Sequence, residues 1–298
     1  MVCKTIQQNK KEMSNPNQSN LPAQDTLIAL VMAGRITEAQ ILSRTFNLNY
    51  QHPILIEAGV SKGIEKTEAF LKKFVTVHPK MQELKNHVRI LANVTDPVLI
   101  CGPSGTGKEL IANALHGSRL GPFVALNCAG MPEHLIESEL FGHVAGAFTD
   151  ARQAKTGLMR HAENGTLFLD EIGDLNINVQ AKFLRALQQK VIRPVGAVED
   201  LAINCRIVCA THWNLEKLIE EKRFRLDLYS RISTFQLNTL PLEERIDDIM
   251  AIVKAHPNFT PDVGLVFASV TNWLGKLPLN VRSLEAMIRR YVVLGIKP

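Results

Sequence analysis

The chain has 298 residues, of which 46% are hydrophobic, so a sizeable buried core is feasible and wholesale disorder is excluded. Its formal net charge of +5 fits a phosphate ligand and weak nucleic-acid contact equally well, and decides between neither. The five cysteines have no CxxC spacing, and there is neither a signal peptide nor an apolar run of membrane-spanning length. These features predict a soluble, cytoplasmic protein without a disulfide framework.

The N-terminal quarter of the chain is the least informative part. Residues 1–24 are rich in Asn, Gln, Ser and Lys, which predicts a disordered tail. Residues 25–73 predict a small helical segment of unknown role, with helices at Thr26–Ala33 and Thr37–Phe46. A helix-turn-helix DNA reader is an alternative there, but the spacing is poor and no recognition helix is marked. DNA binding is therefore not evident in the sequence.

Residues 74–240 change to alternating strands and helices, which indicates an α/β core with a parallel sheet between helices. The apolar runs that predict buried strands are Val98–Cys101, Phe123–Asn127, Gly165–Asp170 and Cys205–Ala210. After Pro241 the strand pattern stops. Residues 241–298 predict a C-terminal all-α lid, with helices at Leu242–Ala255, Asp262–Leu274 and Val281–Val293.

One predicted strand–loop–helix segment contains Gly102-Pro103-Ser104-Gly105-Thr106-Gly107-Lys108, followed by Glu109. This is a GxxxxGK loop, in which glycines let the backbone N–H groups wrap a phosphate chain. The following helix N-terminus adds positive potential, and Lys108 is expected to reach the β- and γ-phosphates. The segment predicts an ATP-binding P-loop. Glu109 occupies the position where a Ser or Thr usually ligates magnesium.

Two carboxylates, Asp170 and Glu171, end the hydrophobic strand predicted at Gly165–Asp170. This pattern fits a Walker B element. Asp170 is predicted to hold Mg²⁺, directly or through water, and Glu171 to polarise the attacking water. Hydrolysis also needs positive charge at the γ-phosphate, and Arg223–Arg231 is rich in candidates. Taken alone, that stretch is equally typical of a solvated helix face.

Several further motifs occur together. They are Glu137-Ser138-Glu139-Leu140-Phe141-Gly142-His143, Gly146-Ala147-Phe148-Thr149-Asp150-Ala151, Asp170–Leu175, Phe224–Arg231, Leu240–Arg245 and Asn280–Glu285. Over roughly residues 75–298 they resemble the AAA+ domain of sigma-54-dependent transcriptional activators, the bacterial enhancer-binding proteins. The fold class this implies is a P-loop NTPase AAA+ core with a helical lid.

The resemblance assigns roles to three arginines. Arg225 and Arg231 look like the pair that reaches into the nucleotide of the neighbouring subunit. Arg282 looks like the lid arginine that senses the γ-phosphate. An active site completed by a neighbour implies a homo-oligomeric ring, usually a hexamer.

The resemblance also assigns roles at the strand ends. Asn127 matches the residue that contacts the catalytic Glu171, and Thr211 matches the first sensor position. Glu109 is no longer anomalous, because this family also has Glu after the P-loop lysine.

The loop Gly146–Ala151 is the working end that the resemblance implies, since in the family it contacts sigma-54 and passes hydrolysis to the closed promoter complex. Two departures from the family pattern bear on this. Asp150 replaces a glycine of GAFTGA, and His212 replaces the usual Asn beside Thr211. The chain also ends at Pro298, where the family usually continues into a DNA-binding domain, so activation without such a domain is expected.

Three functions stay open from the sequence. The first is an ATPase that remodels the sigma-54 RNA polymerase holoenzyme, which the GAFTDA loop favours. The second is an AAA+ remodeller with another client, which Asp150 favours. The third is a weakly hydrolysing regulatory subunit of a sibling activator, which only His212 supports.

Overall fold

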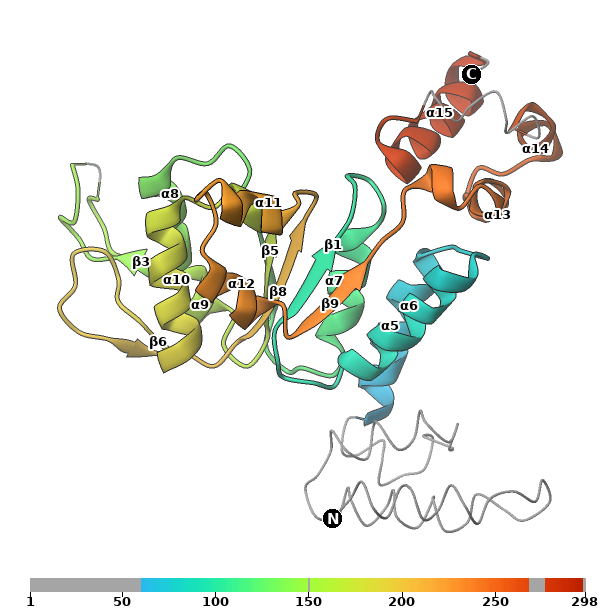
Figure 1. Ribbon diagram of the computed structural model, residues 1–298. Helices are drawn as coiled ribbons and strands as arrows, with labels where there is room; N and C mark the ends of the chain where they lie inside the picture. Colours follow the sequence, from blue (N-terminus) through green and yellow to red (C-terminus); the bar gives the residue numbers. More distant parts are fainter. Residues whose placement is uncertain (1–59, 150, 268–276, 297–298) are drawn as a thin grey trace, which may run out of the picture. The chain divides into compact units, whose positions relative to one another are not determined.

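The computed structural model describes residues 60–149, 151–267 and 277–296 (Figure 1). The tail predicted for residues 1–24, the helices predicted at Thr26–Ala33 and Thr37–Phe46, and Asp150 of the partner loop lie outside these residues. The chain divides into two compact units, Met1–Ile64 and Glu65–Pro298. The sheet, the candidate site and the C-terminal helices all belong to the second unit.

A five-stranded parallel sheet forms the centre of this unit, in the order β2-β5-β8-β1-β9. The strands are β1 (Val98–Cys101), β2 (Phe123–Asn127), β5 (Thr166–Asp170), β8 (Arg206–Thr211) and β9 (Phe235–Asn238). Four of them coincide with the predicted strands to within one residue at each end. The sequence analysis missed β9, whose Phe-Gln-Leu-Asn alternation reflects an edge strand with one half-exposed face rather than a continuous apolar run.

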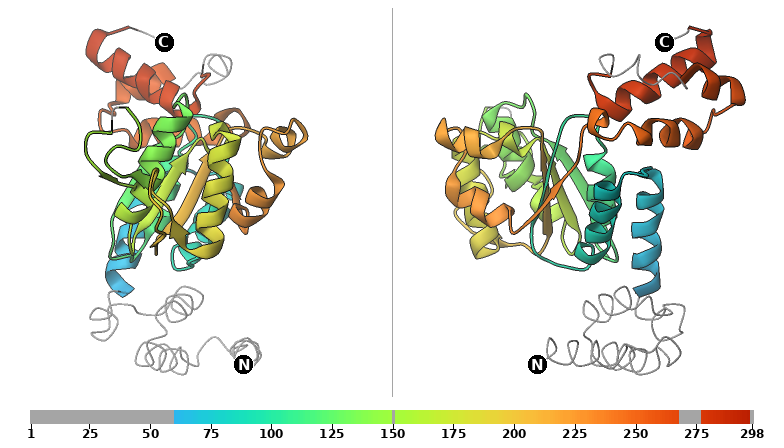
Figure 2. Two further views of the ribbon diagram at one scale, coloured as in Figure 1. Left: turned by 90° about the vertical axis from the view of Figure 1, so that its left-hand side faces the viewer. Right: turned by 45° about the vertical axis from the view of Figure 1, so that its right-hand side comes forward.

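Helices cover both faces of the sheet, as Figures 1 and 2 show. One face packs Leu99, Leu169 and Cys209 against α8 (Glu133–Phe141), α10 (Ile177–Gln189), α11 (Leu215–Glu220) and α12 (Leu226–Ile232). The opposite face packs the alternate strand residues, such as Ile100 and Phe168, against α6 (Pro79–Leu91) and α7 (Lys108–His116). Because successive strand residues point to opposite faces, burial on both sides explains why these strands are apolar throughout. The predicted α/β class is confirmed.

The helix α5 (Val60–Lys73) precedes the core and has 14 residues. The other elements of the core are short. They are the hairpin of β3 (Gly142–His143) and β4 (Lys155–Thr156), α9 (Leu158–His161), η1 (Ile172–Asp174) and the hairpin of β6 (Val191–Ile192) and β7 (Leu201–Ala202). Within the described ranges, no helix combines the length and the apolar character that crossing a bilayer requires.

Among the described residues, four helical segments follow the sheet and form the lid (residues 242–294): η2 (Leu242–Glu244), α13 (Asp247–Ala255), α14 (Pro261–Phe267) and α15 (Asn280–Leu294). They share an apolar core that includes Ile249, Phe267 and Leu284. The helix predicted over Leu242–Ala255 is broken at Arg245, whose backbone leaves helical geometry (φ −138°, ψ 54°). The Arg245 side chain is buried. Residues 268–274 of the helix predicted at Asp262–Leu274 lie outside the described residues.

Candidate nucleotide-binding site and partner loop

The glycine-rich loop joins β1 to the N-terminus of α7, at the carboxyl edge of the parallel sheet. This edge is where open α/β sheets bind ligands. Gly105 and Gly107 have positive φ angles of 75° and 99°. At Gly105 a Cβ would lie 2.0 Å from the carbonyl oxygen of Leu279 in the lid, so the close approach of the lid also demands glycine. The loop therefore has the left-handed glycine conformations expected of a phosphate-binding loop.

Lys108 is the first residue of α7, and its side chain is only 7% exposed. Its Nζ donates hydrogen bonds to the carbonyl oxygens of Gly102 at 2.9 Å and Pro103 at 3.3 Å. The same amine lies 3.7 Å from Oε1 of Glu171. The loop thus folds around a lysine whose charged end faces the carboxylate at the end of β5. Thr106, also buried, donates to the Pro103 carbonyl at 2.8 Å and fixes the turn from inside.

Asp170 closes β5, and its Oδ1 accepts a hydrogen bond from the backbone N–H of Glu171 at 3.1 Å. Burial raises the pKa of Asp170, and the charge of Glu171 raises it further, while Lys108 opposes the shift. Within the described residues no lysine or arginine forms an ion pair with Asp170. A divalent cation beside this carboxylate would offset both unfavourable effects, so the residues present fit a magnesium ion.

Glu171 has a left-handed backbone (φ 55°) and a side chain that is 13% exposed. Its Oε2 accepts two hydrogen bonds from His212, from the backbone N–H at 3.0 Å and from ring Nδ1 at 2.6 Å. Among the hydrogen bonds of the described residues, none joins Asn127 to Glu171. Instead, Oδ1 of Asn127 accepts the N–H of Ala129 at 2.9 Å. Asn127 does sit level with Asp170, its register partner across β2 and β5.

Thr211 is the last residue of β8 and is fully buried. Its strand lies between β1, which leads into the P-loop, and β5, which ends at Asp170. The Thr211 carbonyl accepts the N–H of Gly102 at 3.1 Å, and its hydroxyl accepts the N–H of Trp213 at 3.0 Å. The P-loop, Thr211 and the Asp170–Glu171 pair therefore lie on three adjacent strands of the same sheet edge.

The lid reaches the P-loop through Asn280, at the start of α15. Its Nδ2 donates to the Ser104 carbonyl at 2.9 Å, while its Oδ1 accepts the N–H of Leu242 at 2.7 Å. Arg282 follows in the first turn of α15, and a Cβ at Gly105 would lie 3.2 Å from the Cβ of Arg282. The lid arginine thus stands beside the phosphate loop.

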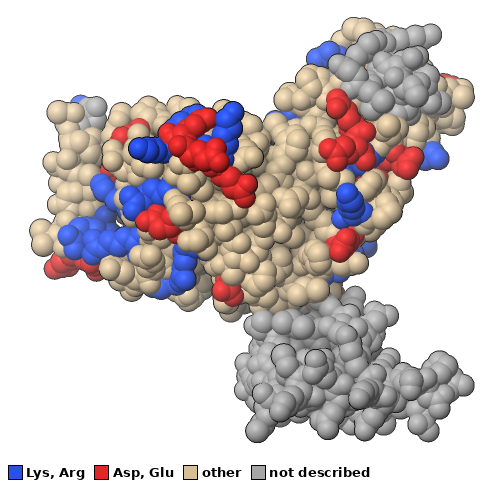
Figure 3. Space-filling model, viewed as in Figure 1, with Lys and Arg blue, Asp and Glu red and all other residues tan. Residues whose placement is uncertain are grey.

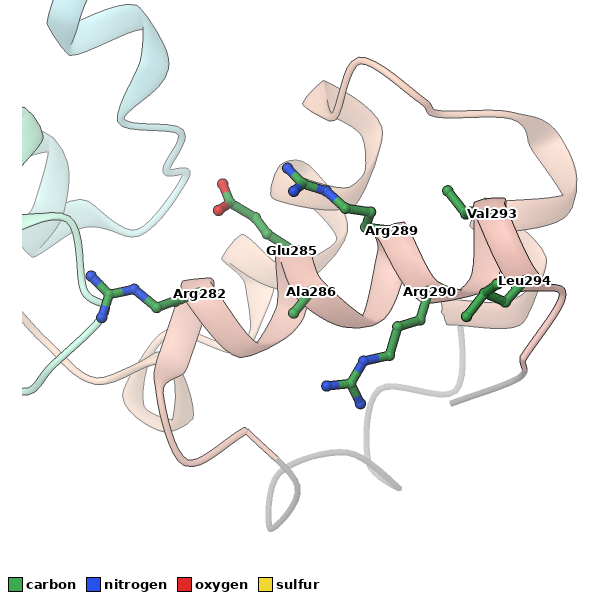
Figure 4. A pocket seen from close by; sticks show the side chains of 7 residues that line it. All are labelled: Arg282, Glu285, Ala286, Arg289, Arg290, Val293 and Leu294. Carbon is green, nitrogen blue, oxygen red and sulfur yellow. The ribbon is translucent and has the colours of Figure 1, made fainter.

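Arg282 also lines one end of a hollow of about 520 Å³ along α15 (Figure 4). The other residues that line it are Glu285, Ala286, Arg289, Arg290, Val293 and Leu294. In Figure 4, Arg282 extends away from the rest of this set. Glu109, predicted to help bind the cofactor, lies in the first turn of α7 and is exposed.

Arg225 is the N-cap residue of α12, and Arg231 lies in the last turn of the same helix. Arg225 pairs with Asp227 at 2.6 Å, and together with Leu226 and Ser230 these residues line an open hollow of about 540 Å³. Arg231 is exposed and forms no ion pair within the described residues. No hydrogen bond or ion pair of the described residues joins either arginine to the P-loop of its own chain.

The partner loop, Gly146–Ala151, is the tip of the β3–β4 hairpin. The Gly146 N–H donates to the Ala151 carbonyl at 2.7 Å, and the Ala151 N–H to the Phe148 carbonyl at 2.9 Å. Phe148 is 39% exposed, and its ring meets the His143 ring edge-on with centroids 4.9 Å apart. Thr149 is exposed, and Ala147 is half-buried. The loop is closed by backbone bonds and presents one apolar ring.

His143 holds the base of this loop. Its Nε2 donates to the Gln153 carbonyl at 3.0 Å, so in the neutral ring Nδ1 accepts from the Ser138 hydroxyl at 2.7 Å. The segment after β6 also holds the base of the loop, since the Val144 N–H, next to His143, donates to the Val195 carbonyl at 3.1 Å. A link thus runs from α8 through His143 to Phe148.

The sequence did not predict the contacts of three residues in this region. His212 is a departure from the family pattern, but its hydrogen bonds to Glu171 were not predicted. Asn280 belongs to a family motif, but its contact with the P-loop was not predicted. His143 likewise belongs to a family motif, and its ring contact with Phe148 has no signal in a single sequence.

Together, the doubly covered parallel sheet, the glycine-rich loop with Lys108, and the Asp170–Glu171 strand end define an AAA+ P-loop ATPase domain. The family model described as "Sigma-54 interaction domain" matches residues 74–238. The chain belongs to this family, the AAA+ domain of bacterial enhancer-binding proteins, as predicted.

Similar proteins agree with this assignment. The chain is 38% identical over 279 residues to the response regulator protein PilR of Pseudomonas aeruginosa, covering 89% of this chain and 62% of PilR. It is 39% identical over 279 residues to the anaerobic nitric oxide reductase transcription regulator NorR of Escherichia coli O6:H1, covering 90% of this chain and 54% of NorR. Each relative is thus considerably longer than the matched region.

Among solved structures, NtrX from Brucella abortus in complex with ADP is similar with a TM-score of 0.64 and 29% identity. The match covers 81% of this chain and 54% of that one.

Proposed function

We propose that this chain hydrolyses ATP and uses the energy to remodel the sigma-54 RNA polymerase holoenzyme. The observation that carries the ATPase proposal is the 3.7 Å approach of Lys108 Nζ to Glu171 Oε1 at the mouth of the P-loop. It brings a phosphate-binding amine and a water-polarising carboxylate together at one place on the sheet edge. The ADP bound to the similar NtrX supports the same ligand class.

Each group at the sheet edge has a proposed task. The backbone N–H groups of Gly102–Gly107 cradle the phosphates, and Lys108 binds the β- and γ-oxygens. Asp170 would hold Mg²⁺, which neutralises charge on the phosphate oxygens when bound. Glu171 polarises the attacking water, and Thr211 responds to the γ-phosphate from the end of β8.

The ring is proposed from the arginines. Arg231 is exposed and Arg225 is half-buried, and no hydrogen bond or ion pair of the described residues joins either arginine to the P-loop of its own chain. This supports their use on the nucleotide of a neighbour. Arg282 would act within the same chain, from the lid. A homo-oligomeric ring, proposed to be a hexamer, completes every site. The α/β core is proposed to span residues 74–240 and the lid residues 241–298.

Phe148 and Thr149 are the proposed contacts to sigma-54. Single exposed aromatic side chains are ordinary, but this one tops a closed hairpin next to the ATPase core. On the face shown in Figure 3, basic and acidic side chains are interspersed, so this face lacks the continuous basic stripe typical of a DNA-binding surface.

A pull-down of sigma-54 tests the proposal, with no nucleotide, with ADP, and with ADP plus a metal-fluoride transition-state mimic. We expect binding only with the mimic, and loss of binding in Phe148→Ala with ATPase activity kept. Phe259→Ala is the matched control, because Phe259 in the lid has nearly the same exposure (38% against 39%). It should bind like the unmodified protein.

A second function is favoured by one observation, the Asp150 in place of a loop glycine. It adds a charge at the point of contact, which supports an AAA+ remodeller with another client. Absence of sigma-54 binding by a protein that hydrolyses ATP would favour this reading.

A further inference from the structure

The carboxylate of Glu171 is held on one side by a single residue. Both hydrogen bonds to its Oε2 come from His212, one from the backbone N–H at 3.0 Å and one from ring Nδ1 at 2.6 Å. A carboxylate oxygen accepts about two hydrogen bonds in its plane, so Oε2 has little capacity left for a water molecule. Because an ionised carboxylate only accepts, Nδ1 must carry the proton.

Oε1 is consequently the oxygen of Glu171 that can accept a hydrogen bond from the attacking water. It lies 3.7 Å from Nζ of Lys108, the amine that belongs to the phosphate-binding loop. Holding Oε2 therefore turns Oε1 toward the position where the γ-phosphate and its attacking water belong. The left-handed backbone of Glu171 contributes to this orientation from the other end of the side chain.

His212 is itself fixed by its neighbour Trp213. The two rings lie 4.7 Å apart at an interplanar angle of 36°. The indole Nε1 of Trp213 donates to Oδ1 of Asp174 at 2.9 Å, and its backbone N–H donates to the Thr211 hydroxyl at 3.0 Å. A Cβ at Gly173 would lie only 2.7 Å from Cδ1 of Trp213, so η1 packs closely under the indole. The strand end that carries His212 is thus locked against the segment that follows Glu171.

We propose that His212 is a positioning residue for ATP hydrolysis, which presents Oε1 of Glu171 to the attacking water. The proposal rests on the ATPase function proposed above. In that reaction the water oxygen bonds to the γ-phosphorus while the bond to the β,γ-bridging oxygen breaks and ADP leaves with the electron pair. The water proton passes to Oε1. In this role His212 acts only through Glu171, the residue to which both of its hydrogen bonds are made.

Steady-state ATP hydrolysis and binding of a fluorescent ATP analogue test the proposal, in the full chain and in His212→Ala, His212→Asn and Glu171→Gln. We expect His212→Ala to lower kcat by about 10- to 100-fold, because a misaimed general base loses much of its contribution. KM and analogue affinity should stay within about threefold, because His212 does not contact nucleotide. His212→Asn should recover part of kcat, because the backbone bond remains and an amide N–H can donate to Oε2.

The double variant Glu171→Gln/His212→Ala distinguishes a role of His212 in positioning Glu171 from a loss of activity caused by a disturbed fold. If His212 acts through Glu171, the double variant should be no slower than Glu171→Gln alone. His87→Ala, on the exposed side of α6, is the matched control and should leave turnover unchanged.

Three results would overturn the role of His212. They are an unchanged or raised kcat in His212→Ala, a further loss in the double variant, and equal losses of kcat and analogue affinity. An unmodified protein that binds the analogue but shows no turnover would instead refute the ATPase proposal, and the positioning role with it.

Discussion

The hydroxyl of Thr76 donates a 2.6 Å hydrogen bond to the carboxylate of Asp248, 172 residues later in the chain. The other carboxylate oxygen accepts the backbone N–H groups of Val77 at 2.6 Å and His78 at 3.1 Å. Buried Arg245 lies 3.4 Å from the same side chain and donates to the Thr106 carbonyl at 3.3 Å. One carboxylate in α13 thus ties the start of the core to the lid, and through Arg245 to the P-loop.

Removing this carboxylate should therefore destabilise the protein strongly. Asp248→Ala leaves the fully buried Arg245 without its ion-pair partner and removes the acceptor of two donors, the Thr76 hydroxyl and the Val77 N–H, which costs about 3–5 kcal/mol. The free energy of unfolding, measured by urea denaturation, checks the value. The adjacent Asp247→Ala is the control, since Asp247 is exposed and its loss should cost about 1 kcal/mol or less. Equal losses in the two variants would contradict the argument.

The sequence predicted those features that depend on local chemistry. The P-loop is recognisable because its glycines are imposed by backbone geometry at Gly105 and Gly107, and the buried strands because both faces need apolar residues. The end of the predicted strand also identified Asp170, whereas Thr211 was assigned only through the family resemblance.

Features that depend on long-range pairing were not predictable. Nothing near His212 in the sequence names Glu171 as its partner, because β5 and β8 become neighbours only in the folded sheet. The same holds for Thr76 and Asp248. The broken helix at Arg245 was missed because its buried polar contacts override a helical periodicity.

Lys108→Ala should weaken nucleotide binding about 10- to 100-fold, since charge-assisted hydrogen bonds to phosphate contribute about 1.5–3 kcal/mol. Titration with a fluorescent ATP analogue measures the change. Lys182→Ala serves as the control, because Lys182 is an exposed lysine of α10 that pairs with Glu137. Affinity that is unchanged in Lys108→Ala would refute the P-loop assignment.

Arg231→Ala should retain nucleotide binding and lose hydrolysis, because its side chain is expected to act on the site of a neighbour. The loss is expected to be about 10³-fold or more in kcat, the scale of an arginine finger. Mixing Arg231→Ala with Lys108→Ala should restore some activity, since a Lys108→Ala subunit can lend its intact Arg231 to a neighbour with an intact P-loop. No recovery in mixed rings, with mixing verified by tagged subunits, would place Arg231 outside the site.

The free energy of unfolding should depend on pH through His116. This residue is the last of α7, and its Nδ1 lies 3.0 Å from the Thr166 hydroxyl. Burial, and next the charge of Arg119, lower the pKa of His116 to about 4 from its ordinary value of 6.5. Between these values the unfolded chain binds a proton that the folded chain does not, so the free energy of unfolding falls as the pH falls.

Replacing His116 by Gln should remove this contribution and make the acid loss of stability shallower. Because the ring is partly solvated, the difference should be on the order of 1 kcal/mol between about pH 7 and pH 5. Urea denaturation at both pH values measures it, with His87→Gln as an exposed-histidine control on α6. If His116→Gln and the unmodified protein lost stability in parallel on acidification, the pKa of His116 would be the same in the folded and unfolded chains, and burial beside Arg119 and Phe123 would not explain the acid sensitivity.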